Sequence, residues 1–230
     1  MCGRTSLFQP QPEIERRFGA AFEVEYEPRY NIAPGDGLVV VHDEDPETLT
    51  VDEWGFTPAW ADSFDGGPRP INARAETVEE TDLFRSVFEN RRALVIADGF
   101  YEWAGDRGGK QPYRVELEAG SLFAMAGVWS RWESGEMERT TVAILTSEAN
   151  DVVEPIHDRM PVILEAGEES TWLDPDTLSA AKSLLGPYEG GDMDAYPISP
   201  LVNDPANDSP AVIDPVGGRE GQSDLGSFGD

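Results

Sequence analysis

Apolar residues in this chain gather in short runs that are bounded by glycine, proline and charged residues. Short runs rich in valine, isoleucine, leucine and aromatic residues are typical of β-strands. We therefore predict strands at residues 38–42, 49–54, 93–97, 100–103, 113–117, 122–129, 140–146 and 162–164. Strands at 122–129 and 140–146 would form an antiparallel pair across a charged turn at 133–138.

Helical signals are fewer and shorter. Prolines at its start, acidic residues in its first turn and a closing Gly19 predict a helix over residues 10–19. Further helices are expected at about 79–90, 148–154 and 177–185. Loops are expected at 30–35, 61–70, 105–109 and 157–160, and the chain from Pro197 onward should be irregular.

Many short strands with a few short helices predict an α+β fold. We expect a single domain over residues 1–216, built on a curved or barrel-like antiparallel β-sheet with a few short flanking helices. Residues 217–230 are dominated by glycine, serine and acidic residues, which predicts a disordered acidic tail.

The charge is strongly one-sided. The chain has 45 acidic and 17 basic residues, a formal net charge of −28, and only two lysines, Lys110 and Lys182. This balance fits adaptation to a very salty cytoplasm, where carboxylates keep a protein soluble. At ~1 M salt the Debye length is about 3 Å, so distant carboxylates do not exclude a nucleic-acid partner. The local placement of arginines must decide.

A single cysteine excludes an intrachain disulfide, and the sequence has no apolar run long enough for a membrane span or a secretory signal. We expect a cytoplasmic protein without a membrane partner, and a monomer. Zinc-type cysteine and histidine pairs, a glycine-rich dinucleotide motif and a Walker sequence are all missing, so neither a metal nor a cofactor is predicted.

The lone cysteine, Cys2, follows Met1 directly. A small residue at this position permits methionine removal, which would leave an α-amine beside a thiol. Their reference pKa values are about 7.7–8.0 and about 8.5, so both are partly reactive near neutrality. Such an aminothiol traps aldehydes as a thiazolidine. The alternative is an unimportant thiol on a frayed chain end.

Two other residues are candidates for proton transfer. His157 lies in a loop between charged residues and a proline, and the only other histidine, His42, ends a valine-rich strand. Glu102 stands between Tyr101 and Trp103, where partial desolvation would raise its pKa and suit proton shuttling. The structural alternatives are a loop histidine and a solvent-facing strand residue.

Asn72 and Arg74 are two residues apart, so in an extended segment they point to one face. An amide beside a guanidinium suits a phosphodiester. Arg4 has the same spacing from Cys2 and is a second candidate for holding a phosphate. For each arginine alone, a surface ion pair is the alternative.

Taken in order, several motifs of this chain resemble the SOS-response-associated peptidase (SRAP) family. The motifs are Met1-Cys2-Gly3-Arg4, Tyr30-Asn31-Ile32-Ala33-Pro34, Trp54-Gly55-Phe56 with Pro58 and Trp60-Ala61, Ile71-Asn72-Ala73-Arg74-Ala75-Glu76-Thr77, Arg92 with Ala97-Asp98-Gly99-Phe100-Tyr101-Glu102-Trp103, Ala126-Gly127-Val128-Trp129 and Ile156-His157-Asp158-Arg159-Met160-Pro161. They span residues 1 to about 216.

The resemblance implies a sensor of abasic sites in single-stranded DNA that bonds to the ring-opened sugar through its N-terminal cysteine. It assigns Cys2 as nucleophile, Asn72 as a positioning group, Glu102 as a proton shuttle and His157 as an aid to ring opening. It also implies DNA-binding roles for a further set of residues. These are Arg4, Asn31, Pro34, Trp60, Arg74, Arg85, Thr146 and Arg159.

Two other functions remain open from the sequence. One is a cysteine peptidase or amidase in which Cys2, His157 and Glu102 act as nucleophile, base and orienting group. The other is a noncovalent module that binds single-stranded DNA through Trp60, Phe56 and arginines. The covalent sensor and the noncovalent module both need basic groups to bind DNA. In this chain only arginines are candidates for that role, and Arg91 and Arg92 are among them.

Overall fold

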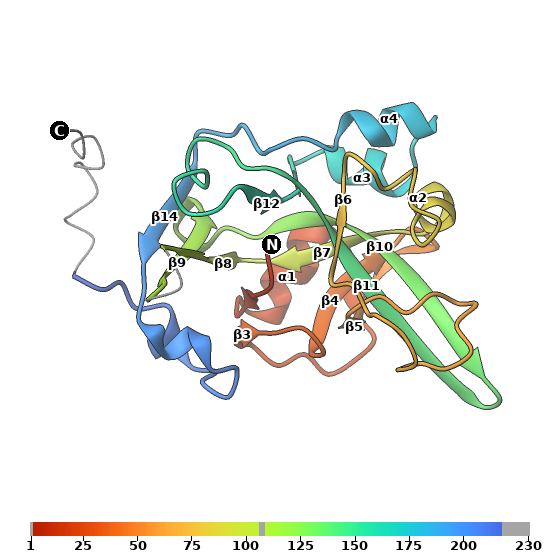
Figure 1. Cartoon of the computed structure of the whole chain (residues 1–230), viewed down its shortest axis with the longest axis horizontal. Coiled ribbons are helices and arrows are strands. Elements are labelled where there is room, and N and C mark those ends of the chain that lie inside the picture. Colours follow the sequence, from red (N-terminus) through yellow and green to blue (C-terminus); the bar gives the residue numbers. More distant parts are fainter. Residues whose placement is uncertain (1, 106–108, 218–230) are drawn as a thin grey trace.

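The computed structural model describes residues 2–105 and 109–217 and has the predicted α+β architecture, in which strands dominate (Figure 1). In chain order, with η denoting a 3-10 helix, its elements are β1 (Thr5–Leu7), α1 (Gln11–Phe18), β2 (Ala21–Phe22), β3 (Arg29–Ile32), β4 (Gly37–His42), β5 (Asp45–Trp54), β6 (Asn72–Arg74), α2 (Arg85–Asn90), β7 (Arg92–Ala97), β8 (Gly99–Ala104), β9 (Gln111–Leu117), η1 (Glu118–Gly120), β10 (Phe123–Ser134), β11 (Met137–Glu148), β12 (Arg159–Pro161), β13 (Ile163–Leu164), α3 (Glu168–Leu173), α4 (Leu178–Ser183), β14 (Met193–Pro197), η2 (Pro200–Asn203) and η3 (Pro210–Val212).

A closed barrel forms the centre of the fold. Strands β11, β10, β7, β4 and β5 pair in that order, all antiparallel, and β5 returns to β11 through a short parallel pairing. The expected barrel-like sheet is therefore confirmed, and its closing pair is parallel. The long β10–β11 hairpin projects beyond the barrel at the lower right of Figure 1.

A second sheet has the strand order β14, β9, β8, β1 and β3. Strand β1, which starts three residues after Cys2, lies inside this sheet between β8 and β3. One hydrophobic core joins both sheets, since the same cluster contains Leu7 and Phe100 from the second sheet and Val95 and Val142 from the barrel. The N-terminal strand is thus part of the core.

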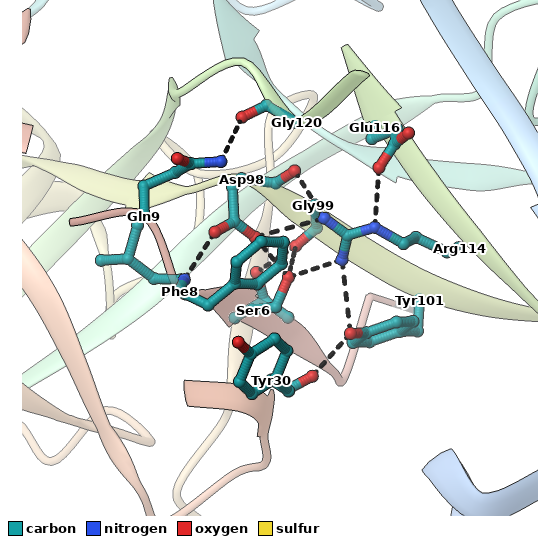
Figure 2. Close-up of polar contacts among 12 residues, drawn as sticks. Ser6, Phe8, Gln9, Tyr30, Asp98, Gly99, Tyr101, Arg114, Glu116 and Gly120 are labelled. Carbon is teal, nitrogen blue, oxygen red and sulfur yellow. Dashed lines mark hydrogen bonds and ion pairs between the residues drawn. The ribbon is translucent and has the colours of Figure 1, made fainter. Parts of the chain in front are cut away.

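A buried polar network holds β1 against β8 (Figure 2). Arg114, which is fully buried, donates to Ser6 Oγ on β1 at 2.7 Å, to the Asp98 carbonyl at 2.9 Å and to Glu116 Oε2 at 2.9 Å. Asp98 in turn accepts from the Ser6 hydroxyl at 2.6 Å and from the backbone N–H of Phe8. This network fixes the register of the two strands.

Gly99 shows how tightly this network is packed. A Cβ atom at this position would lie 2.4 Å from the central guanidinium carbon of Arg114. Any larger residue would therefore displace Arg114 from its partners, and the glycine is required by a close approach rather than by a turn.

The short helices begin and end where local chemistry dictates. Gly19 ends α1 in the left-handed conformation at φ 66°, and its N–H bonds to the Glu15 carbonyl. Thr177 caps the start of α4 by accepting from the N–H of Ala180. The predicted helix at 177–185 is therefore present, and its helical part is Leu178–Ser183. The prediction at 10–19 is confirmed.

Two predicted helices are wrong in extent or kind. Of residues 79–90 only Arg85–Asn90 is helical, because the Thr81 hydroxyl bonds to the Thr77 carbonyl at 2.9 Å and holds a turn. Of residues 148–154, Glu148 ends β11 and 151–154 form turns instead of a helix, since Asn150 Oδ1 accepts from the N–H groups of Val152 and Val153.

Two predicted loops are partly strands. Arg29–Ile32 pairs with β1, and Arg159–Pro161 pairs with β11. No local sequence signal predicted the short elements β1, α3 and β14, whose pairing or burial depends on distant segments. The expected loop at 61–70 is irregular, as predicted. The centre of the expected 105–109 tip and nearly all of the expected tail lie outside the described residues.

Many surface arginines are bound to carboxylates. Ion pairs of this kind include Arg17–Glu169, Arg29–Asp208, Arg69–Glu53, Arg131–Glu44 and Arg139–Glu53. They leave few basic groups uncompensated. In the described part of the chain, no helix is long and apolar enough to cross a membrane.

The buried network generates a stability prediction. Arg114→Met should destabilise the protein by roughly 3–5 kcal/mol, because Asp98 and Glu116 would stay buried without their cation. For a domain of this size that corresponds to a Tm drop of about 6–20 °C. Lys182→Met is the matched control, since its pair with Glu79 is exposed and should contribute at most about 1 kcal/mol. Equal Tm losses in the two variants would contradict a special role for the buried network.

Candidate functional site

Cys2 is fully buried, and its surroundings define the site. The Asn72 amide Nδ2 donates to the Cys2 carbonyl at 2.8 Å, and the Cys2 thiol contacts the Arg4 carbonyl at 4.0 Å. The Tyr101 N–H bonds to that same Arg4 carbonyl at 3.0 Å, which places the segment beside β8. The chain end is therefore fixed by strands β6 and β8.

Glu102 faces this buried end from β8. Its side chain is almost fully buried, and its Oε1 atom has no hydrogen-bond partner within the described residues. Burial raises the pKa of Glu102 to about 7, although the positive charges of the amino terminus and of Lys110 oppose the rise. At neutral pH this carboxyl group can therefore either donate or accept a proton.

The charge of Glu102 also acts on the thiol. Burial raises the pKa of the Cys2 thiol, and the negative charge of Glu102 raises it further. Because such an effect in a folded protein requires proximity, Cys2 and Glu102 belong to one site. At neutral pH the thiol is protonated, and a nearby base is needed to take its proton.

Asn72 begins the short strand β6, which pairs in parallel with β11 opposite Ile144. Ala73 is buried while Asn72 and Arg74 lie on the more exposed face, as predicted from their spacing. Asn72 Oδ1 is buried and lacks a partner within the described residues. Unpaired buried oxygens on Asn72 and Glu102 are acceptor positions available to a ligand.

His157 precedes β12 and is partly buried. Its Nδ1 accepts from the Arg159 N–H at 3.0 Å, and an Asp158 carboxylate oxygen lies 3.1 Å from the same atom. Burial lowers the pKa of His157, the charge of the amino terminus lowers it too, and Asp158 acts in the opposite direction. The imidazole is thus neutral at neutral pH.

His157 and Glu102 respond to the same charges. The amino terminus and Lys110 influence the pKa of both groups, and Asp158 raises the pKa of Glu102. The N-terminal segment bonds to Asn72 on β6 and to Tyr101 on β8, the strand that carries Glu102 (Figure 1). Cys2, Asn72 and Glu102 therefore form one cluster, and the shared charges indicate that His157 lies near it.

Exposed cations lie at this site. Arg74 and Lys110 are exposed, and neither has an ion pair within residues 2–105 and 109–217. Arg4 donates to Asn31 Oδ1 at 2.7 Å and to the Val202 carbonyl, and its guanidinium carbon lies 5.9 Å from the Trp103 ring centroid. Lys110, which the sequence interpretation did not select, is one of only two lysines, and that scarcity was its available signal.

Other predicted DNA-binding residues have structural contacts of their own. Asn31 is fully buried, and its amide donates to the carbonyls of Val202, Asp204 and Asn207. Thr146 is buried on β11 and accepts from Arg159 at 3.2 Å. These contacts tie the site to the rest of the fold.

Of the remaining predicted DNA-binding residues, three lie on the surface and the fourth, Arg92, is buried. Pro34 is exposed in the turn between β3 and β4, and Trp60 is 74% exposed beside a cavity of about 270 Å³. Arg85 lies on α2, donates to the Glu79 carbonyl at 2.8 Å and pairs with Asp82, both of which are near it in sequence. Arg92 is not available as a groove arginine, because it is buried and donates to four backbone carbonyls.

Metal binding has no support at this site. Among the described residues, no group of three or more histidine, cysteine, aspartate or glutamate side chains is arranged to hold a metal ion. The side chains at the site supply a thiol, a carboxyl group, an imidazole and an amide.

The amino-acid sequence of the whole chain is similar to those of several curated proteins. The chain is 41% identical over 225 residues to the abasic site processing protein YoqW of Bacillus subtilis, covering 93% of this chain and 99% of that protein. It is 29% identical to the abasic site processing protein YedK of Escherichia coli, covering 94% of this chain and all of that protein. The abasic site processing protein HMCES of Gallus gallus is also 29% identical, with 94% of this chain and 78% of that protein covered.

Solved structures share the fold. A crystal structure of a protein from Bacteroides thetaiotaomicron superposes with a TM-score of 0.85 at 26% identity, covering 94% of this chain and 100% of the other. A phage-related protein from Bordetella bronchiseptica superposes with a TM-score of 0.68 at 29% identity, covering 86% and 94%. The model of the family described as SOS response associated peptidase (SRAP) matches residues 1–205. This chain therefore belongs to the SRAP family.

Proposed function

We propose that this protein recognises abasic sites in single-stranded DNA and bonds to them covalently through Cys2 after removal of Met1. The observation that carries the proposal is the convergence of Cys2, Asn72 and Glu102, with unpaired buried oxygens on the latter two. Relatives over nearly the full chain are named abasic site processing proteins, which supports an abasic site as the substrate.

The first step uses the α-amine of Cys2. An abasic sugar in its ring-opened form carries an aldehyde, whose carbon the amine attacks to give a carbinolamine. Loss of water then gives an imine. Asn72 holds the Cys2 carbonyl at 2.8 Å, so the amine next to it has a fixed position relative to Glu102. Fixing both reactants lowers the entropy cost of this attack.

The second step uses the thiol. The sulfur adds to the imine carbon, the thiol proton is transferred to the nitrogen, and a five-membered thiazolidine closes. The overall reaction joins one aldehyde to one aminothiol and releases one water. Because burial keeps the Cys2 thiol protonated, a proton acceptor is required, and Glu102 with its pKa of about 7 fits that role.

His157 suits an earlier event, the opening of the sugar ring. Ring opening moves a proton from the anomeric hydroxyl to the ring oxygen, and a neutral imidazole near the site suits such a transfer. Its Nδ1 is oriented by the Arg159 N–H, which fixes the plane of the ring.

DNA would be held mainly by groups next to the site. Arg74 and Lys110 are exposed cations without ion pairs among the described residues, and Arg4 adds a third positive group. Trp60 offers an exposed ring, and stacking on aromatic rings contributes ~1–3 kcal/mol per base without sequence preference. Such stacking and the covalent bond would compensate for the low basic charge of the surface.

Cys2→Ala tests the covalent mechanism. Alanine also permits methionine removal, so this variant keeps an α-amine but loses the sulfur. With abasic single-stranded DNA, the wild type should give a heat-stable protein–DNA band on a denaturing gel. The variant should give a band only after borohydride reduction, which traps the imine. A heat-stable band from Cys2→Ala without reductant would contradict the thiazolidine.

The same samples separate the other two functions. A wild type that keeps Met1 by intact mass, forms no band and cleaves peptides would support a peptidase. Equal affinity of wild type and Cys2→Ala for abasic and intact strands, again without a band, would support a noncovalent binding module.

Glu102→Gln tests the proton shuttle. The wild-type crosslinking rate should show a titration with a midpoint near pH 7. The variant should lose that titration and react roughly a hundredfold more slowly, because amides do not transfer protons in this range. An unchanged pH profile in the variant would assign the proton transfer to another group.

Glu102→Gln also has a consequence for stability that does not depend on DNA. Since the pKa of Glu102 is higher in the folded state, the folded state binds this proton more tightly. Wild-type stability should therefore fall as pH rises from about 4.3 through about 7, whereas the variant lacks this contribution. The Tm advantage of the variant should be larger at pH 8 than at pH 5, and an equal advantage at both would show that Glu102 titrates normally.

A further inference from the structure

An ion pair beside the site joins two segments that carry its residues. Arg159 Nη1 lies 2.6 Å from Glu76 Oε1, and Nη2 lies 3.0 Å from Glu76 Oε2. Two parallel bonds of this kind fix the relative orientation of both side chains. The Arg159 side chain is 14% exposed and the Glu76 side chain 46% exposed, so the pair is partly shielded from water.

The pair crosses strand β11. Residues Asn72–Arg74 pair with one side of β11 and Arg159–Pro161 with the other, and Thr146 is opposite both Arg74 and Pro161. Arg159 reaches over this strand, donating to the carbonyl and the hydroxyl of Thr146 on the way to Glu76. Its guanidinium therefore joins three segments of the chain.

Both segments need such a connection. Strands β6 and β12 each contain only three residues and are held by few backbone hydrogen bonds. Asn72 lies four residues before Glu76. His157 lies two residues before Arg159 and accepts a hydrogen bond from the Arg159 N–H. A shift of either short strand along β11 would move Asn72 or His157 relative to Cys2.

We propose that Glu76 is a positioning residue, which acts through Arg159 to set the distance and orientation between Asn72 and His157 at the crosslinking site. The proposal rests on the proposed function for its effect on rate, although not for its effect on His157. Glu76 forms part of the site's framework and takes no part in the chemistry.

Charge gives the opposite expectation, and this makes the proposal testable. Removing the Glu76 carboxylate takes away one negative charge next to Arg74 and frees Arg159 for a phosphate. If Glu76 acted only through its charge, its loss would tighten DNA binding and speed the reaction. A positioning role predicts a slower reaction despite equal or tighter binding.

The test compares Glu76→Gln with Glu80→Gln. Glu80 is exposed and its carboxylate has no hydrogen bond or ion pair within the described residues, so the control makes the same charge change without breaking a contact. Crosslinking rates are measured against the concentration of an abasic single-stranded oligonucleotide. At saturating DNA we expect Glu76→Gln to react about tenfold more slowly than wild type, with unchanged or higher affinity, and Glu80→Gln to match wild type.

Imidazole NMR signals give a readout that is independent of DNA. The chain has only two histidines, and His42 is paired with Asp52 at 2.8 Å in the barrel, remote in sequence from both substitutions. Glu76→Gln should shift the His157 nitrogen signals and leave those of His42 in place, whereas Glu80→Gln should shift neither.

The outcomes separate the two proposals. If the wild type crosslinks and Glu76→Gln retains the saturating rate to within about twofold, the positioning role is overturned. If the wild type forms no crosslink, the proposed function fails, and the imidazole signals alone decide: a shifted His157 supports the positioning role and an unshifted one overturns it.

Discussion

The docking of strand β1 against β8 is the constraint on which the site depends. Chain ends are usually poorly ordered, yet in this protein the residues after Cys2 form an internal strand whose register is set by the buried Arg114. Taking a guanidinium and two carboxylates out of water costs several kcal/mol per ion, and only complete pairing offsets that cost. The network therefore tolerates one arrangement of β1, and that arrangement places Cys2 against Glu102.

Burial also determines the chemistry of the site. Full burial keeps the Cys2 thiol protonated, near-full burial lets the Glu102 carboxyl group hold its proton up to about pH 7, and partial burial keeps the His157 imidazole neutral. In the proposed reaction, the groups whose charge can change are then the α-amine and the substrate. The permanent cations, Arg74 and Lys110, lie at the exposed edge, where phosphates would be. In the proposed reaction, proton transfer and phosphate binding would thus be separated in space.

Much of this could be predicted from the sequence, and the exceptions have physical causes. Short apolar runs predicted the barrel strands because those runs are buried wherever they occur, as at residues 93–97. The predicted helix at 79–90 was too long because the Thr81 hydroxyl stabilises a turn that a helical pattern does not reveal. Among the site residues, Cys2 and Glu102 were identifiable from chemistry and context. Glu76 was not, because its role depends on a partner 83 positions away across β11.

The acidic surface changes how salt should act on DNA binding. In most DNA-binding proteins added salt weakens affinity, since phosphate contacts release counterions. The chain has 45 acidic residues against 17 basic ones, so a DNA strand would be repelled at long range, and at ~1 M salt this repulsion is screened beyond a Debye length of about 3 Å. In the proposed complex, contacts of DNA with Arg74 and with the exposed Trp60 ring would act at short range and persist. Local geometry at the site, rather than net charge, would then set the affinity of that complex at high salt.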